Sequence, residues 1–117
     1  MVLILEELPE FHTLYQKMLD GIATTISARN IKEAVEKFNL IHDSLSVIVL
    51  AARTQGQPNT IPLVHKFREK FRGPMIVISC DANYRRGMKM AGCDYEADKL
   101  EVVDLILEIL QKQKSGN

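Results

Sequence analysis

Polar side chains that could carry chemistry stand at the ends of three apolar runs in this chain. They are Glu6 and Glu7 after the first run, Ser79 at the end of a later one, and Lys99 after a short third one. Continuous apolar runs rich in β-branched residues are typical of strands buried in a parallel sheet. Because such strands end at one edge of the sheet, where ligands bind, we expect these four side chains to converge there.

The central apolar run, residues 46–52, ends without such a group. Ala51 stands at its end, and its methyl group can neither ligate a metal ion, donate a hydrogen bond nor carry charge. The adjacent carboxylates of Glu6 and Glu7 repel each other, so one of them should be protonated or paired. We therefore predict a salt bridge from Lys99 to one of them, which for a partly exposed pair contributes at most ~1 kcal/mol. Ser79 is expected to cap its strand end or to bind water.

A second chemical arrangement is Cys80-x5-Arg86, the spacing of cysteine-dependent phosphatases, placed between an expected strand and an expected helix. That chemistry needs a loop whose backbone N–H groups hold phosphate and activate the thiol. Such loops usually contain glycine, and a hydroxyl residue follows the arginine. This loop has no glycine, and Gly87 follows Arg86. We therefore favour a protein without enzymatic activity, and a small α/β phosphatase remains the alternative.

Composition narrows the class of protein. The 117 residues, 46% of them hydrophobic, suffice for one domain with a substantial core. Fifteen basic and fifteen acidic residues cancel, which does not favour nucleic-acid binding. No apolar run approaches the ~18 residues of a membrane span, and the first residues lack the basic region of a signal peptide. We expect a cytoplasmic protein that binds neither nucleic acid nor membrane.

Cofactors and metal ions are not expected. Cys80 and Cys93 lack the spacing of metal ligands and are too few for a disulfide framework, which favours a reducing compartment. His12, His42 and His65 fall in three different expected helices. None has an acidic or cysteine partner at ligand spacing, so we predict that they face solvent.

The whole chain alternates buried runs with amphipathic segments. Strands are expected near residues 2–5, 23–27, 46–52, 75–79 and 95–97, each followed by a helical pattern. This alternation implies right-handed βαβ crossovers and a parallel sheet covered on both faces. The common arrangement in a small domain of this kind is five strands in the order 2-1-3-4-5 with five helices, which is a flavodoxin-like α/β fold. We expect one domain over residues 1–113, with a tail or the start of a linker at 114–117.

Together these features resemble the receiver domain of bacterial response regulators over essentially the whole chain. Glu6-Glu7-x-Pro9 stands where the family has an acidic pair followed closely by proline. Ser79 stands where the family has serine or threonine, and Gly92-Cys93-Asp94 resembles the Gly-Ala-Asp before strand five. Lys99 stands where the family has an invariant lysine. The resemblance implies two-component signalling and the five-stranded fold.

The departures from the family concern its chemistry. The aspartate that the family phosphorylates would fall at Ala51, so the nucleophile and one magnesium ligand are both absent. The acidic pair is Glu-Glu, the aromatic switch position falls at Glu96, and Leu100 replaces a proline. The chain thus resembles a pseudo-receiver, whose degenerate phosphorylation pocket comprises Glu6, Glu7, Ala51, Ser79 and Lys99.

A surface for a protein partner or an output domain is expected on the fourth helix, fifth strand and fifth helix, which receivers commonly use. Basic residues of the fourth helix could face acidic residues of the fifth across a two-fold axis in a homodimer. An extra apolar stripe beside the core stripe, which begins at Leu100, would form the centre of this surface. The expected surface residues are Arg85, Arg86, Lys89, Glu96, Glu101, Val102, Asp104, Leu105, Glu108 and Ile109. The best interpretation of the sequence is a signalling module that acts through protein contacts without phosphorylation.

Overall fold

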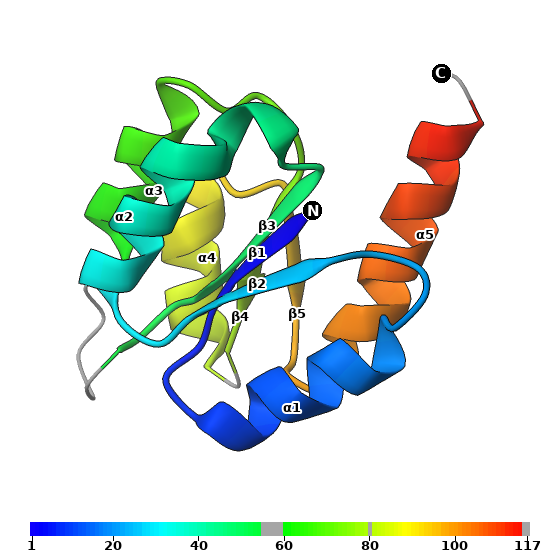
Figure 1. The fold of residues 1–117 in the computed structure, drawn as a ribbon. Helices are drawn as coiled ribbons and strands as arrows, with labels where there is room; N and C mark the ends of the chain where they lie inside the picture. The colour runs from blue at the N-terminus through cyan, green and yellow to red at the C-terminus, as the bar shows by residue number, and fades with distance from the viewer. Residues whose placement is uncertain (55–59, 80, 116–117) are drawn as a thin grey trace.

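The structure is a computed structural model that describes residues 1–54, 60–79 and 81–115. Within these residues, strands and helices alternate along the chain (Figure 1). The strands are Val2–Leu5 (β1), Thr25–Ala28 (β2), Val47–Ala51 (β3), Met75–Ile78 (β4) and Tyr95–Ala97 (β5). The helices are Pro9–Met18 (α1), Ile31–Ile41 (α2), Ile61–Arg68 (α3), Ala82–Ala91 (α4) and Val102–Lys114 (α5), with a 3₁₀ turn at His42–Ser44 (η1).

All strand pairs are parallel, and the order across the sheet is β2-β1-β3-β4-β5. The prediction of a five-stranded, flavodoxin-like α/β fold in the order 2-1-3-4-5 is therefore confirmed. The three inner strands are buried along their whole length, as their unbroken apolar sequences require. Leu5 of β1 lies opposite Leu50 of β3, which in turn lies opposite Val77 of β4, so the three strands end at nearly the same level.

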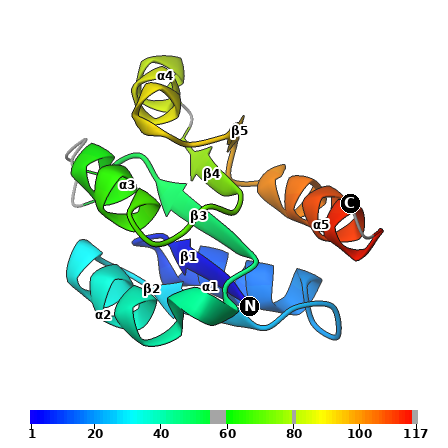
Figure 2. The ribbon, with the colours of Figure 1, turned by 90° about the horizontal axis from the view of Figure 1, so that it is seen from above.

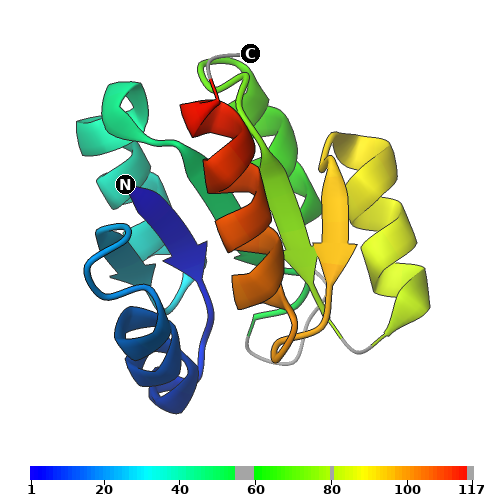
Figure 3. The same ribbon diagram turned by 90° about the vertical axis from the view of Figure 1, so that its right-hand side faces the viewer.

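Helices cover both faces of the sheet (Figures 2 and 3). α2, α3 and α4 cover one face, where the rings of Phe38 and Phe67 stack with centroids 4.0 Å apart. α1 and α5 cover the other face, where Tyr15 and Ile106 are buried. No helix in the described residues is both long and apolar enough to cross a bilayer.

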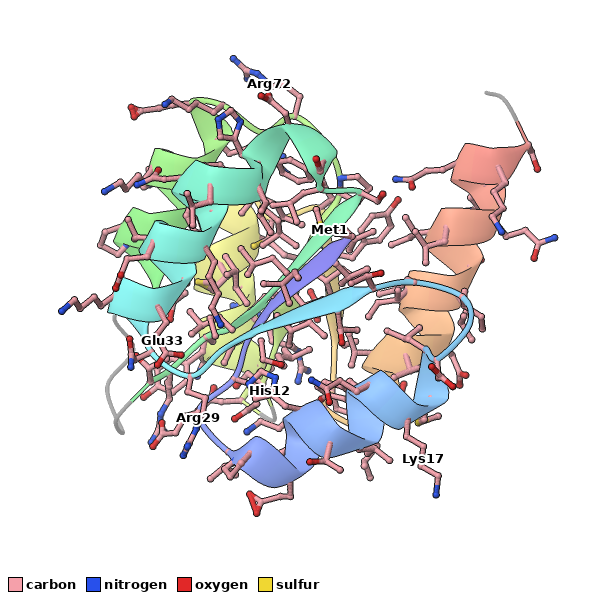
Figure 4. The ribbon with its side chains drawn as sticks, in the orientation of Figure 1. Met1, His12, Lys17, Arg29, Glu33 and Arg72 are labelled. Atoms are coloured by element: carbon pink, nitrogen blue, oxygen red, sulfur yellow. The ribbon has the colours of Figure 1, made fainter. Side chains whose placement is uncertain are left out.

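Local sequence signals account for most helix boundaries. Asn30 caps α2, since its side-chain oxygen accepts a hydrogen bond of 2.8 Å from the Glu33 N–H. The Glu33 carboxylate in turn accepts from the N–H of Arg29, and these two residues lie beside each other in Figure 4. Pro9 and Pro62 occupy first helical turns, where a missing N–H costs nothing.

One expected boundary is wrong, since β2 begins only at Thr25 and not at residue 23. Leu100 is 73% exposed and does not belong to the core stripe of α5, which begins at Val102. The reason is a turn before the helix, in which the Asp98 carboxylate accepts hydrogen bonds from the backbone N–H groups of Leu100 and Glu101.

Candidate functional site

A cavity of about 380 Å³ opens at the carboxyl edge of the sheet, where β1, β3 and β4 end. All five residues of the predicted degenerate pocket line this cavity, together with four others. The lining residues are Glu6, Glu7, Leu8, Ala51, Arg53, Ile78, Ser79, Asp81 and Lys99. The sequence prediction that these strand ends converge holds in the structure.

Glu6 is the buried anion of this cavity. Its Oε1 lies 2.8 Å from the Nζ of Lys99, and its Oε2 accepts a 3.0 Å hydrogen bond from the Leu8 N–H. The Glu6 side chain is only 2% exposed, whereas that of Lys99 is 32% exposed. The predicted salt bridge from Lys99 to the acidic pair is thus confirmed, with Glu6 as the partner.

Lys99 is held in place by aromatic residues of α1. Its Nζ lies 4.9 Å from the centroid of the Phe11 ring, a cation–π distance. Its backbone carbonyl accepts a 2.6 Å hydrogen bond from the Tyr15 hydroxyl. Burial, with the negative charges of Glu6 and Asp98, raises the pKa of Tyr15 far above its usual range, so the hydroxyl keeps its proton for this bond.

Ala51 and Ser79 lie at the ends of β3 and β4. Ala51 is buried and presents only its methyl group to the cavity. The Ser79 hydroxyl oxygen accepts a 3.0 Å hydrogen bond from the Asp81 N–H, which is the capping role predicted from the sequence. Asp81 then caps α4 by accepting from the N–H groups of Asn83 and Tyr84.

Several solved structures with this architecture are response-regulator receivers. A receiver protein from Pseudoalteromonas atlantica superposes with a TM-score of 0.80 at 15% identity, covering 98% of this chain and 97% of that one. A two-component response regulator from Clostridium difficile superposes with a TM-score of 0.79 at 16% identity, covering 97% of this chain and 96% of that one. The chain has the receiver fold. A third neighbour, from Burkholderia pseudomallei, was solved with a phosphorylated aspartic acid, calcium ion and citrate, with a TM-score of 0.79 at 16% identity, covering 98% of this chain and 68% of that one. No family model and no curated protein matches the sequence.

Two polar residues of the cavity in this receiver fold, Arg53 and Asp81, are absent from the set predicted from the sequence. Arg53 lines the wall, with its guanidinium 5.3 Å from the centroid of the Tyr84 ring, and Asp81 lines it from the turn before α4. A signal for Arg53 was present, because it lies two residues beyond Ala51 and alternate residues of an extended chain point to the same side. Among the described residues, no group of three or more histidine, cysteine, aspartate or glutamate side chains could hold a metal ion.

The prediction that His12 faces solvent is wrong. His12 is buried between α1 and the sheet, and its Nε2 lies 2.7 Å from the backbone oxygen of Glu6 (Figure 4). The ring therefore ties α1 to the loop that carries the acidic pair. His42 is half-buried in η1 rather than in a helix of its own, and only His65 is exposed as predicted.

The expected partner surface is only partly exposed. Val102 and Ile109 are 0% and 4% exposed and pack in the core under the sheet, so their assignment to the apolar centre is wrong. The physical reason is that α5 uses a broad face, since four of its residues are buried in the core cluster that also contains residues of β1, β3 and β4. Leu105 is half-buried in the same cluster.

Charges on α4 and β5 pair within the molecule. Arg85 and Lys89 both contact Glu96, with N–O distances of 3.2 and 3.6 Å. Arg86 lies with Met90 at a separate cavity of about 400 Å³ on this face, away from the cavity over Ala51. Cys80 lies outside the described residues, so nothing supports the phosphatase alternative, and Arg86 does not line the cavity at the sheet edge.

Proposed function

We propose that this chain is a pseudo-receiver, a signalling module of two-component type that works by protein contact and without phosphorylation. The observation that carries the proposal is Ala51, whose methyl group stands at the end of β3 among the polar ends of the other strands. A phosphoryl group needs a carboxylate or another nucleophile to accept it. A module of this kind has no catalytic residue, needs no cofactor and would act in the cytoplasm.

The ion pair of Lys99 with Glu6 supports this proposal. In the phosphorylated receivers that this chain resembles, the lysine at this position contacts the phosphate. Here Lys99 already has a buried carboxylate as its partner, 2.8 Å away. The loop between β5 and α5 is thereby tied to the loop after β1 without any added group.

Exposure to acetyl phosphate and magnesium tests the proposal chemically. Intact-mass spectrometry should find no covalent phosphoryl adduct on the wild-type chain. The matched variant Ala51→Asp places a carboxylate between Glu6, Ser79 and Lys99, and an adduct on that variant alone would assign the difference to this position. A wild-type adduct mapped to any residue of the cavity would refute the proposal.

The contact surface that we propose lies on α4, β5 and the start of α5. Met90 is 83% exposed there, beside Arg86, and the exposed acidic residues Glu101, Asp104 and Glu108 lie on the solvent side of α5. Arg86 forms no ion pair with any described residue, whereas Arg85 and Lys89 are paired with Glu96. The partner is another protein or an output domain, and a second copy of the chain would pair Arg86 with the acidic face of α5.

Sedimentation distinguishes these occupants of the surface. If two copies associate, Arg86→Glu and Met90→Asp should each shift a dimer toward monomer while the far-UV circular dichroism stays unchanged. Arg72→Glu, at an exposed arginine outside this surface, is the control. A wild-type chain that stays monomeric at high micromolar concentration would refute the homodimer and leave the heterologous partner.

A further inference from the structure

The turn between α1 and β2, residues 19–24, leaves large apolar side chains in water. Gly21 has a φ of +77°, a left-handed conformation that glycine adopts without strain and that lets the chain leave α1 in a tight turn. The Ile22 side chain that follows is 50% exposed, and Met18, four residues earlier, is 44% exposed. Exposed apolar side chains that lie together are typical of surfaces that another molecule covers.

Residues 22–24 form a ridge between two hollows of the surface. The first hollow, of about 490 Å³, lies on the side of α1 and β2, and the second, of about 360 Å³, lies on the side of α5. Residues 22–24 line both. The first is also lined by Gln16, Asp20, Gly21 and Thr25, and the second by Met1, Ser46, Leu110, Gln113 and Lys114. In Figure 1 this turn and α5 lie on the same side of the molecule.

The two hollows have opposite charge. Among the described residues, Asp20 is the only charged side chain that lines the first hollow, and Lys114 is the only one that lines the second. Both side chains are exposed, and neither forms an ion pair with any other residue that the structure describes. Lys17, one turn before Asp20, lines neither hollow and points into solvent in Figure 4. Ile22 therefore stands between an uncompensated carboxylate and an uncompensated ammonium group.

This arrangement is complementary to itself. A two-fold axis that passes through the ridge, in the plane of contact, places the first hollow of each copy against the second hollow of the other. Asp20 of each copy then faces Lys114 of the other, and the two Ile22 side chains meet at the centre. An apolar centre with charges at its rim is the usual order of a protein interface. We infer that a second copy of this chain binds at the ridge, through Ile22 and two Asp20–Lys114 pairs.

The dimer inferred here does not use the contact surface on α4, β5 and the start of α5. The residues of that surface line neither hollow, since α5 contributes to the second hollow only through its last two turns. The surface on α4 and β5 is then left to a partner of another kind. The inference does not rest on the proposed signalling function, because it concerns a different face of the molecule.

Sedimentation velocity of the whole chain at high micromolar concentration tests the inference. The wild-type protein should form a dimer that dissociates on dilution. Ile22→Asp, Asp20→Lys and Lys114→Glu should each raise the dissociation constant about tenfold or more, because each buries a charge or sets like charges against each other. The double variant Asp20→Lys with Lys114→Glu should restore the dimer, since the exchanged charges again face each other across the two-fold axis. These side chains are exposed, so the far-UV circular dichroism should stay unchanged in every variant.

Glu36→Lys and Arg72→Glu are the matched controls, because they reverse exposed charges on the other side of the molecule and should leave the dimer intact. A monomeric wild-type protein would overturn the inference without bearing on the absence of phosphorylation, which mass spectrometry tests separately. A dimer that persists in Ile22→Asp, or that Arg86→Glu and Met90→Asp dissociate instead, would also overturn it. So would a double variant that fails to recover dimerisation.

Discussion

Lys99 and Glu6 form an ion pair with an N–O distance of 2.8 Å between a buried carboxylate and a partly exposed ammonium group. The two residues are far apart in sequence, and the pair joins the loop after β5 to the loop after β1. Glu6 also accepts the Leu8 N–H and its backbone oxygen contacts His12. These internal contacts therefore tie together the loops at the carboxyl edge of the sheet.

Replacing Lys99 with methionine should destabilise the protein. The methionine keeps much of the packing on Phe11 but leaves the Glu6 carboxylate buried without its cation, which we expect to cost about 2 kcal/mol of unfolding free energy. Urea denaturation measures the change. Lys112→Met is the control, because Lys112 pairs with Glu108 at 3.8 Å on an exposed helix face and should change stability by less than about 0.5 kcal/mol.

A double-mutant cycle measures the interaction energy between Glu6 and Lys99 separately from their other contacts. If Glu6→Gln and Lys99→Met together cost clearly less than the sum of the single changes, the two side chains are coupled as the structure indicates. Additive losses would show that the ion pair contributes nothing to stability.

Arg68 should be the most sensitive arginine of the chain. Its guanidinium donates to the backbone oxygens of Phe71, Gly73 and Gly92 and contacts the Asp94 carboxylate at 2.6 Å. Arg68→Lys keeps the charge but cannot reach these acceptors together, so it should cost about 2–4 kcal/mol in urea denaturation. Arg72→Lys, at an exposed position labelled in Figure 4, is the matched control and should be neutral. Equal effects of the two changes would contradict this role.

Alkaline stability should depend on Cys93. Burial raises the pKa of this thiol to about 12, from an ordinary value of 9.0. Because the folded state holds the proton more tightly, this contribution to stability is complete below about pH 9 and is lost as the pH rises toward 12. The loss should be about 1.4 kcal/mol per pH unit in that window. Cys93→Ala should flatten this slope between pH 9 and 10, before tyrosine side chains of the unfolded chain ionise, and an unchanged slope would exclude the thiol as its source.

The fold could be predicted from the sequence because buried strands and helices leave recognisable patterns of apolar residues. The unbroken apolar run of β3 predicts a central parallel strand, and Asn30 with Glu33 predicts where α2 begins. The salt bridge from Lys99 was predictable for a related reason, since the charges at two strand ends had to meet at one edge.

Exposure of single residues could not be predicted in the same way. The periodicity of α5 shows which residues share a face but not how wide the buried face is, so periodicity alone places Val102 and Ile109 on the surface although they are buried. The helical spacing of Leu100 predicts a core position, because the turn made by Asp98 leaves no apolar pattern. The burial of His12 cannot be predicted from sequence, because its partner is a backbone oxygen, which has no sequence signature.

Beryllofluoride with magnesium tests the central claim most directly, because this complex mimics a phosphoryl group bound to an aspartate. Recorded with and without magnesium, the backbone amide spectrum of the wild-type protein should stay unchanged at Ala51, Ser79 and Lys99 on addition of the complex. Saturable, magnesium-dependent shifts at these three residues would contradict the account, because they would show that the pocket binds a phosphoryl group despite the alanine at the end of β3.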